Sequence, residues 1–155
     1  MAIRNIIKEG DEALTKKCRP VENFDRRLKM LIKDLTDTLR KADGVGLAAP
    51  QVGVLRRAVV ILDDDEKTFI PLINPEIIKK EGKQEGHEGC LSIPGIFGKT
   101  IRPAVVTVKA FDENGKEFTL TRKGLRAVCL CHELDHLDGI LFRTHVFEYI
   151  DTEKE

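Results

Sequence analysis

The stretch Cys131–Gly139 constrains this chain most, because it contains the pattern His-Glu-x-x-His. On an α-helix, residues four apart lie on one face, with about 6 Å of rise between them. His132 and His136 can therefore offer two imidazole nitrogens to one metal ion, and Glu133 can act as a general base on a water at that metal. A catalytic site of this type needs a third protein ligand and an open position.

The sequence around this pattern is apolar, which favours a metal site over a chance match. Such a helix is expected to be buried on most sides. Two histidines and a glutamate inside it would be costly unless they were paired or bound to metal. The apolar neighbours are Leu125, Ala127, Val128, Leu130, Leu134, Leu137, Ile140, Leu141 and Phe142.

Length and composition predict one domain spanning residues 1–155, with a short charged tail from about residue 146. The chain has 155 residues, of which 41% are hydrophobic, enough for a single core. Its 26 basic residues balance 26 acidic ones. This balance indicates neither direct nucleic-acid binding nor an anionic membrane partner.

The chain carries no sign of membrane insertion or secretion. No apolar run approaches the roughly 20 residues of a transmembrane helix. The segment after Met1 lacks the sustained apolar stretch of a signal peptide. We therefore predict a cytoplasmic protein, whose cysteines are reduced thiols: Cys18, Cys90, Cys129 and Cys131.

The pattern of apolar residues predicts helices and strands that do not alternate regularly. An amphipathic helix is expected over 25–41, from the spacing of its leucines and isoleucine. Strands are expected over 57–62, 71–78, 105–111 and 117–121, the last two joined by a turn at 112–115. The order favours an α+β fold, with antiparallel sheets packed around a central His-Glu-x-x-His helix and an N-terminal amphipathic helix.

Two polar or glycine-rich segments allow more than one interpretation. Gly44–Gly53 is either a tight loop or a backbone edge that hydrogen-bonds an extended ligand, with Gln51 as a polar group on it. The residues alone favour the loop. The acidic run Asp63–Glu66 lacks the spacing of a calcium loop, so we expect a solvated turn.

The third metal ligand is not fixed by spacing. Cys129 lies three residues before His132 and shares its helix face. Cys90 lies in a glycine-bounded segment, 86–95, which we expect to be a loop that can bring a thiolate to a metal. Both cysteines stay open. The other candidates are less suited: His87, Glu88, Cys131 and His145.

Three segments together resemble the signature motifs of peptide deformylase: 44–51, 88–92 and 132–139. They occur in the family's order and at its usual separation, and the similarity runs from about Ile3 to Phe142. The resemblance implies a metallo-amidohydrolase that removes the N-formyl group from the initiator methionine of new bacterial polypeptides. Its expected partners are N-formylmethionyl peptides and nascent chains.

The resemblance also implies the roles of individual residues. Cys90, His132 and His136 match the family's metal ligands. One divalent metal is expected, usually Fe(II), with zinc, nickel or cobalt able to replace it. Glu133 matches the general acid/base, and Gln51 with the backbone N–H of Leu91 matches the groups that polarise the formyl oxygen.

Further positions match the family's substrate-binding region. The backbone at Val45 and Gly46 is expected to pair with the peptide as an added strand. Three residues of the helix precede His132 and are expected to border the methionine side chain: Leu125, Val128 and Cys129. Glu88, Gly89 and Arg102 match positions near the site, where the two charged residues orient the substrate or support a ligand. Asp135 is expected to support the site or lie on the helix surface.

The chain departs from the family pattern in two places. Cys131 stands where glutamine is common before the first histidine. The tail is short, whereas some bacterial members dock on the ribosome with a longer basic helix, so docking is left open. No organelle-targeting extension is present, which favours a bacterial cytoplasmic form.

Two other classes of function fit part of the sequence. One is a zinc peptidase of the His-Glu-x-x-His type, in which Glu148 would be the third ligand. The other is a small domain with a structural zinc closed by Cys90 and Cys129, which would bind metal and catalyse nothing.

Overall fold

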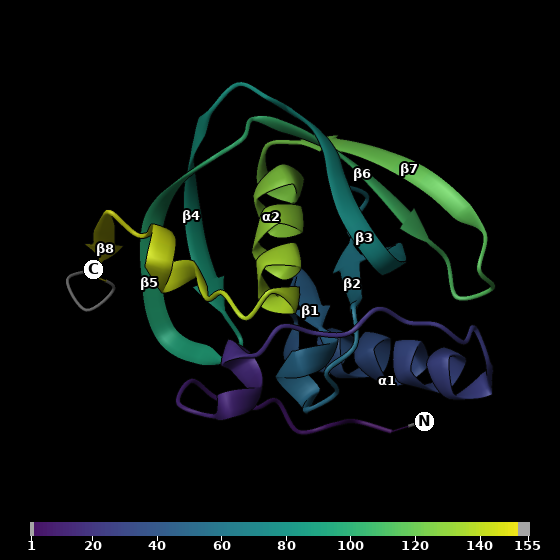
Figure 1. Cartoon of the computed structure of the whole chain (residues 1–155). Coiled ribbons are helices and arrows are strands. Elements are labelled where there is room, and N and C mark those ends of the chain that lie inside the picture. The colour runs from purple at the N-terminus through teal and green to yellow at the C-terminus, as the bar shows by residue number, and fades with distance from the viewer. Residues whose placement is uncertain (1, 152–155) are drawn as a thin grey trace.

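The computed structural model describes residues 2–151, and their fold is α+β with two antiparallel sheets (Figure 1). The predicted α+β class with antiparallel sheets is thereby confirmed. The α-helices are α1 (Arg26–Ala42) and α2 (Leu125–Leu137), and the 3₁₀ helices are η1 (Glu12–Thr15), η2 (Ala49–Val52) and η3 (Phe142–His145). The strands are β1 (Gly46–Ala48), β2 (Ala58–Leu62), β3 (Phe69–Glu81), β4 (Gln84–Cys90), β5 (Ile93–Arg102), β6 (Val105–Phe111), β7 (Glu117–Lys123) and β8 (Glu148–Ile150). Residues 152–155 of the predicted charged tail lie outside the described part.

The two sheets enclose α2. One sheet has the strand order β1-β2-β3-β6-β7, and the other has the order β4-β5-β8. Figure 1 shows α2 near the middle of the molecule, with β4 and β5 on one side and the five-stranded sheet on the other. The strand β1 lies at the end of its sheet, so one of its edges is not paired with another strand.

The helix α1 packs its apolar stripe on the first sheet. Its N-cap, Asp25, accepts a hydrogen bond from the backbone N–H of Leu28 at 3.1 Å, and Asp43, with φ of 55°, ends it in the left-handed region. The stripe is buried against Leu47, Ala58, Val60 and Ile73, and consists of Leu28, Leu31, Ile32, Leu35 and Leu39.

The helix α2 has no solvent-facing side of its own, because both sheets cover it. Eleven of its thirteen residues are buried, and only Leu125 at its start and Asp135 are not. Its apolar residues pack against Val59, Ile61 and Leu72 of the five-stranded sheet. The polar groups of this helix are therefore held in an apolar environment, where each needs a partner.

The segment 86–95, expected to be a loop, is instead the end of β4, a two-residue turn and the start of β5. Its glycines permit close strand packing rather than flexibility. A Cβ at Gly89 would lie 2.5 Å from the Phe97 ring on the paired strand. The prediction was wrong because glycine reads as a loop signal in sequence but here makes room for an aromatic ring.

Other segments extend or shift the expected strands. The strand β3 reaches Glu81 and changes register after Ile73, where Asn74 has a φ of 50°. The Asn74 side chain bonds both the N–H and the C=O of Val21, at 2.8 and 2.9 Å, which explains that backbone conformation. The glycine-rich segment favoured as a loop contains β1 and η2.

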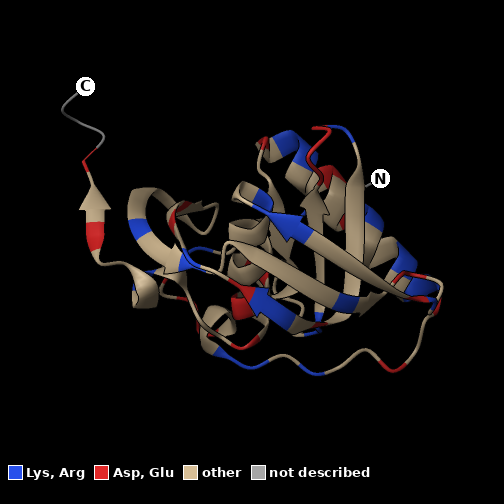
Figure 2. Cartoon of the chain, turned by 90° about the horizontal axis from the view of Figure 1, so that it is seen from above, with Lys and Arg blue, Asp and Glu red and all other residues tan. Residues whose placement is uncertain are grey.

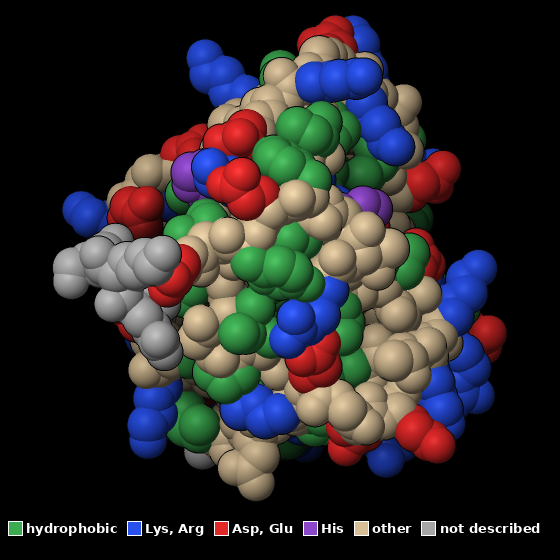
Figure 3. Space-filling model, turned by 90° about the vertical axis from the view of Figure 1, so that its left-hand side faces the viewer, with side chains coloured by type: hydrophobic (Ala, Val, Ile, Leu, Met, Phe, Trp, Pro, Cys, Tyr) green, Lys and Arg blue, Asp and Glu red, His purple; other side chains and the backbone are tan. Residues whose placement is uncertain are grey.

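Charge and exposed hydrophobic groups are spread over the surface. Figure 2 shows Lys and Arg interspersed with Asp and Glu on strands, loops and α1. Figure 3 views the side of the molecule with β4, β5 and β8, where hydrophobic side chains lie among charged ones. The exposed hydrophobic residues between the start of β5 and the end of β8 include Phe97, Phe147 and Tyr149. Within residues 2–151, no helix is long and apolar enough to cross a membrane.

The turn after α2 gives a test of the packing. Gly139 has a φ of 74°, and a Cβ there would lie 2.6 Å from the Thr15 backbone, whereas Gly95, with φ of 79°, has open space. Gly139→Ala is expected to lower the free energy of unfolding by about 2–4 kcal/mol, through backbone strain and overpacking. Gly95→Ala is the control, because it adds the same backbone strain without overpacking, so its loss should be smaller. Equal losses for both variants in urea denaturation would contradict this assignment.

Candidate active site

Cys90, His132 and His136 come together where the end of β4 meets α2. One possible ligand atom from each residue lies within 4.8 Å of the other two, and Cys90 Sγ lies 3.4 Å from His136 Nε2. Among residues 2–151 this is the one such grouping of Cys, His, Asp or Glu. A thiolate and two imidazoles are a donor set that holds zinc or iron and leaves an open coordination position.

Cys129, the rival third ligand, points elsewhere. Its Sγ is 3.6 Å from the backbone O of Val45, to which it donates. Burial raises the pKa of the Cys129 thiol well above its ordinary value, so the group stays neutral. The structure therefore brings Cys90, and not Cys129, to the two histidines.

Glu88 orients the first histidine. His132 Nδ1 lies 2.9 Å from Glu88 Oε1, which leaves the Nε2 atom of the ring for the ligand cluster. Burial raises the pKa of Glu88, but hydrogen bonds from His132, Arg102 and Thr100 outweigh it and lower the pKa to about 2. The carboxylate is therefore charged at neutral pH.

Arg102 lies behind Glu88 and does not line the cavity. Its Nε donates to Glu88 Oε2 at 2.7 Å, its Nη2 donates to Oε1 at 2.9 Å, and its Nη1 donates to Asp135 at 2.8 Å. Asp135 also pairs with His145 at 3.2 Å. Arg102 was expected either to orient the substrate or to support a ligand. These contacts favour the second role, because Arg102 bonds Glu88, which in turn contacts His132.

The two histidines differ in protonation. Burial and the neighbouring charge of His132 lower the pKa of His136 to about 3, so His136 is neutral, as a metal ligand must be. Burial lowers the pKa of His132, but Cys90 and Glu88 outweigh this effect and raise it to about 10. A metal bound at His132 would therefore displace a proton from this histidine.

Glu133 faces the cavity from the neighbouring helix position. Burial raises its pKa to about 7, and His132 opposes this rise. Its Oε1 atom is buried without a hydrogen-bond partner, and a Cβ at Gly46 would lie 2.6 Å from its Oε2 atom. Glycine at position 46 is thus required for Glu133 to occupy this place.

Gln51, from η2, reaches the same point. The backbone N–H of Ala48 donates to Gln51 Oε1 at 2.9 Å, which fixes the amide orientation. Gln51 Nε2 is then 3.1 Å from Ser92 Oγ and 3.5 Å from Cys90 Sγ. The amide N–H groups therefore point toward the ligand cluster.

A cavity of about 460 Å³ opens beside these groups. Most of the site residues predicted from sequence line it: Val45, Gly46, Gln51, Glu88, Gly89, Cys90, Leu91, Leu125, Val128, Cys129, His132 and Glu133. Ile93, Pro94 and Phe97 also line it, and sequence reasoning missed them. The one sequence signal for these residues was that they follow Cys90 closely. The sequence did not predict that this segment forms β5 and pairs with β4.

The polypeptide deformylase family model matches residues 3–150. The chain belongs to the polypeptide deformylase family. Members of this metal-dependent family remove the N-formyl group from nascent peptides. The chain is 52% identical to peptide deformylase 2 of Clostridium acetobutylicum, over 97% of this chain and 99% of that relative.

Solved deformylase structures share the fold. A peptide deformylase from Legionella pneumophila superposes with a TM-score of 0.90 and is 50% identical, covering 94% of this chain and 86% of that one. A peptide deformylase from Synechococcus elongatus in complex with actinonin has a TM-score of 0.87 and 40% identity, covering 92% of this chain and 78% of that one.

Cys131, where this deformylase chain departs from the family pattern, lies in the packed interior. Its side chain is 5% exposed, and burial raises its pKa to about 11, so the thiol is neutral. It is not in the ligand cluster.

Substituting the two competing cysteines tests the ligand set. Cys90→Ser is expected to lower metal affinity by about tenfold or more, because a serine hydroxyl does not ionise near neutral pH as a thiol can. Cys129→Ser should keep one metal per chain, since its side chain bonds Val45. Metal content after dialysis, measured by elemental analysis, checks both variants, and equal losses would refute the assignment.

Proposed function

We propose that this chain is a single catalytic domain, residues 1–155, that hydrolyses the N-formyl group of N-formylmethionyl peptides and nascent chains and releases formate. One observation carries the proposal: the Cys90, His132 and His136 cluster lies beside Glu133 on α2 and opens into the cavity. In this proposal α2 is the central element of the site, and α1 supports the first sheet beneath it.

The open edge of β1 is the proposed site for the peptide main chain. The backbone N–H of Leu62 donates to Val45 O at 2.8 Å, and Gly46 pairs opposite Ile61. Antiparallel pairs alternate in their hydrogen bonding, so the N–H and C=O of Gly46 face away from β2. A peptide added along this edge would bond these groups independently of its side chains.

The apolar end of the cavity is the proposed pocket for the methionine side chain. Leu125, Val128 and Cys129 line it from one side of α2, one turn or two before His132. A neutral, buried Cys129 suits this apolar wall. Glu88 and Gly89, which line the cavity from β4, bound the same space.

A divalent metal held by Cys90, His132 and His136 would polarise the formyl oxygen and make water a better nucleophile at neutral pH. Glu133 accepts a proton from the attacking water, because its pKa of about 7 suits a group that both takes and returns a proton. Glu133 then passes that proton to the departing amine, which completes the hydrolysis.

Gln51 and Leu91 are proposed to stabilise the oxygen that becomes negative as water adds. Gln51 Nε2 is oriented by the Ala48 contact, and it would donate to the formyl oxygen in place of its 3.5 Å contact with Cys90 Sγ. Leu91 follows Cys90 directly and lines the cavity, and its backbone N–H is the proposed second donor. Such fixed donors lower the barrier more than mobile ones do.

The cellular setting follows from the substrate. We propose a cytoplasmic enzyme that acts near the ribosome, where formylated chains emerge, with neither nucleic acid nor membrane as a direct partner. Fe(II) is the proposed metal in the cell, and zinc, nickel or cobalt are proposed substitutes. Thiolate and imidazole ligands suit these metals.

The two rival functions are supported less well. Glu148, the third ligand of the peptidase alternative, pairs with Lys99 at 2.9 Å on β8 and is outside the ligand cluster. Cys129, needed to close a structural zinc site, is also outside it.

The substrate prediction is tested with two peptides. Metal-loaded protein, purified without oxygen, should release formate from formyl-Met-Ala-Ser and should not act on acetyl-Met-Ala-Ser, whose larger acyl group carries an extra methyl. Formate is measured with a coupled dehydrogenase. No formate from folded protein loaded with iron, nickel or cobalt would reject the function.

The role of Glu133 is tested by Glu133→Ala. This variant should keep one metal per chain and lose about 10²- to 10⁴-fold in kcat, because it removes the proton acceptor and not a ligand. Elemental analysis and formate release measure the two properties in one sample. Turnover near the wild-type value would remove Glu133 from the mechanism.

A further inference from the structure

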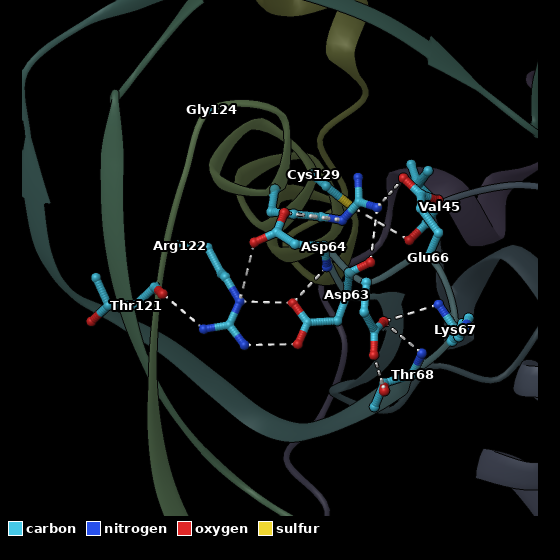
Figure 4. Close-up of polar contacts among 12 residues, drawn as sticks. Val45, Asp63, Asp64, Glu66, Lys67, Thr68, Thr121, Arg122, Gly124 and Cys129 are labelled. Atoms are coloured by element: carbon cyan, nitrogen blue, oxygen red, sulfur yellow. Dashed lines mark hydrogen bonds and ion pairs between the residues drawn. The ribbon is translucent and has the colours of Figure 1, made fainter.

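The acidic turn after β2, Asp63–Glu66, was expected from its sequence to be solvated. In the structure two arginines contact it. Arg122, on β7, donates to both carboxylate oxygens of Asp63 at 2.8 Å (Figure 4). Arg126, on α2, donates from Nη2 to the backbone O of Asp63 and to Glu66 Oε1, each at 2.9 Å. Asp63 is therefore fixed through its side chain and its backbone at once.

The turn itself is rigid. The Asp65 carboxylate accepts hydrogen bonds from the backbone N–H groups of Lys67 and Thr68 and from the Thr68 hydroxyl. These bonds lower the pKa of Asp65 to about 2. Glu66 has a φ of 60°, a strained conformation that the surrounding contacts must maintain.

Arg126 is poorly explained by stability alone. Its side chain is 2% exposed, its Nε atom has no hydrogen-bond partner, and it lies near the positive end of the α2 dipole. A buried cation in that position costs more than an apolar side chain of similar size. We therefore look for the role of Arg126 in the position of the residues that it holds.

The contacts of Arg126 lead to the open edge of β1. Asp63 follows Leu62, whose N–H bonds Val45 O at 2.8 Å. The same Val45 oxygen accepts the Cys129 thiol from α2. Figure 4 shows Val45 and Cys129 close to the turn. The path from Arg126 through Asp63 and Leu62 to Val45 thus joins α2 to the edge strand.

We propose that Arg122 and Arg126 form a clamp on Asp63 that holds the edge strand β1 in place beside α2, and so keeps the backbone groups of β1 positioned to bind the main chain of the peptide. Both arginines are positioning residues, because neither lines the cavity. The proposal rests on the proposed function, in which the peptide pairs with β1.

Two variants test the clamp, and one is a control. Arg126→Met removes both bonds from α2 while keeping a side chain of similar length. Arg122→Met removes the carboxylate anchor from β7 without changing the helix that forms the pocket wall. Arg143→Met is the matched control, because Arg143 pairs with Glu9 away from the turn. Each protein is assayed with formyl-Met-Ala-Ser and with formyl-Met, and its metal content is measured.

Both clamp variants are expected to raise KM for formyl-Met-Ala-Ser by about three- to tenfold, the effect of weakening one main-chain hydrogen bond. Their kcat should stay within about twofold of the wild-type value and their metal content should be unchanged, because no ligand is altered. KM for formyl-Met should change by less than about twofold, since it lays less main chain along β1. Arg143→Met should match wild type throughout.

The outcomes separate the clamp from the function. Wild-type protein that releases no formate would refute the proposed function, and the clamp would fall with it. Active wild-type protein with unchanged KM in both variants would refute the clamp alone. Lost metal, or equal loss of kcat for both substrates, would also overturn it. If Arg126→Met does not fold, Arg122→Met decides the matter, because Arg122 is 24% exposed and lies outside α2.

Discussion

The buried carboxylate of Glu88 is the interaction on which the site depends. It comes from β4, accepts hydrogen bonds from Thr100 and Arg102 of β5, and contacts His132 of α2. A charged group with 3% exposure would be costly without these partners. Because two of these partners lie on β5 and the third lies on α2, the contacts also join the small sheet to the helix. The carboxylate thereby orients the ring of His132 and links β4, β5 and α2.

The helix α2 must satisfy two opposing requirements. It must be apolar enough to lie between two sheets, and it must also carry the polar side chains of His132, Glu133 and His136. Burial then shifts the two neighbouring groups in useful directions, since it keeps His136 neutral and raises the pKa of Glu133 to about 7. Gly46 completes the arrangement, because any larger side chain would occupy the place of the Glu133 carboxylate.

In the proposed function, substrate binding and chemistry lie on separate elements of the fold. The open edge of β1 offers backbone groups, while α2 and the end of β4 offer the reactive ones. Val45, beside β1, accepts hydrogen bonds from Leu62 and from Cys129 of α2, and the acidic turn with its two arginines follows Leu62 directly. A peptide bound as proposed would be held through its main chain, and the pocket beside α2 would select its side chain.

The sequence by itself determined the features that depend on local spacing. The four-residue separation of His132 and His136 placed both on one helix face, the leucine spacing gave α1, and the Asp112–Gly115 turn gave the β6–β7 hairpin. The family motifs then named Cys90. Residue spacing alone left Cys90 and Cys129 open, because Cys90 is 46 residues from His136 and only the packing of β4 against α2 brings it there. The tertiary structure also decided that Gly46 belongs to an edge strand and that Arg126 reaches Asp63, 63 residues away. Local sequence fixes which face a side chain occupies, but which distant chain meets that face depends on the packing of both sheets around α2.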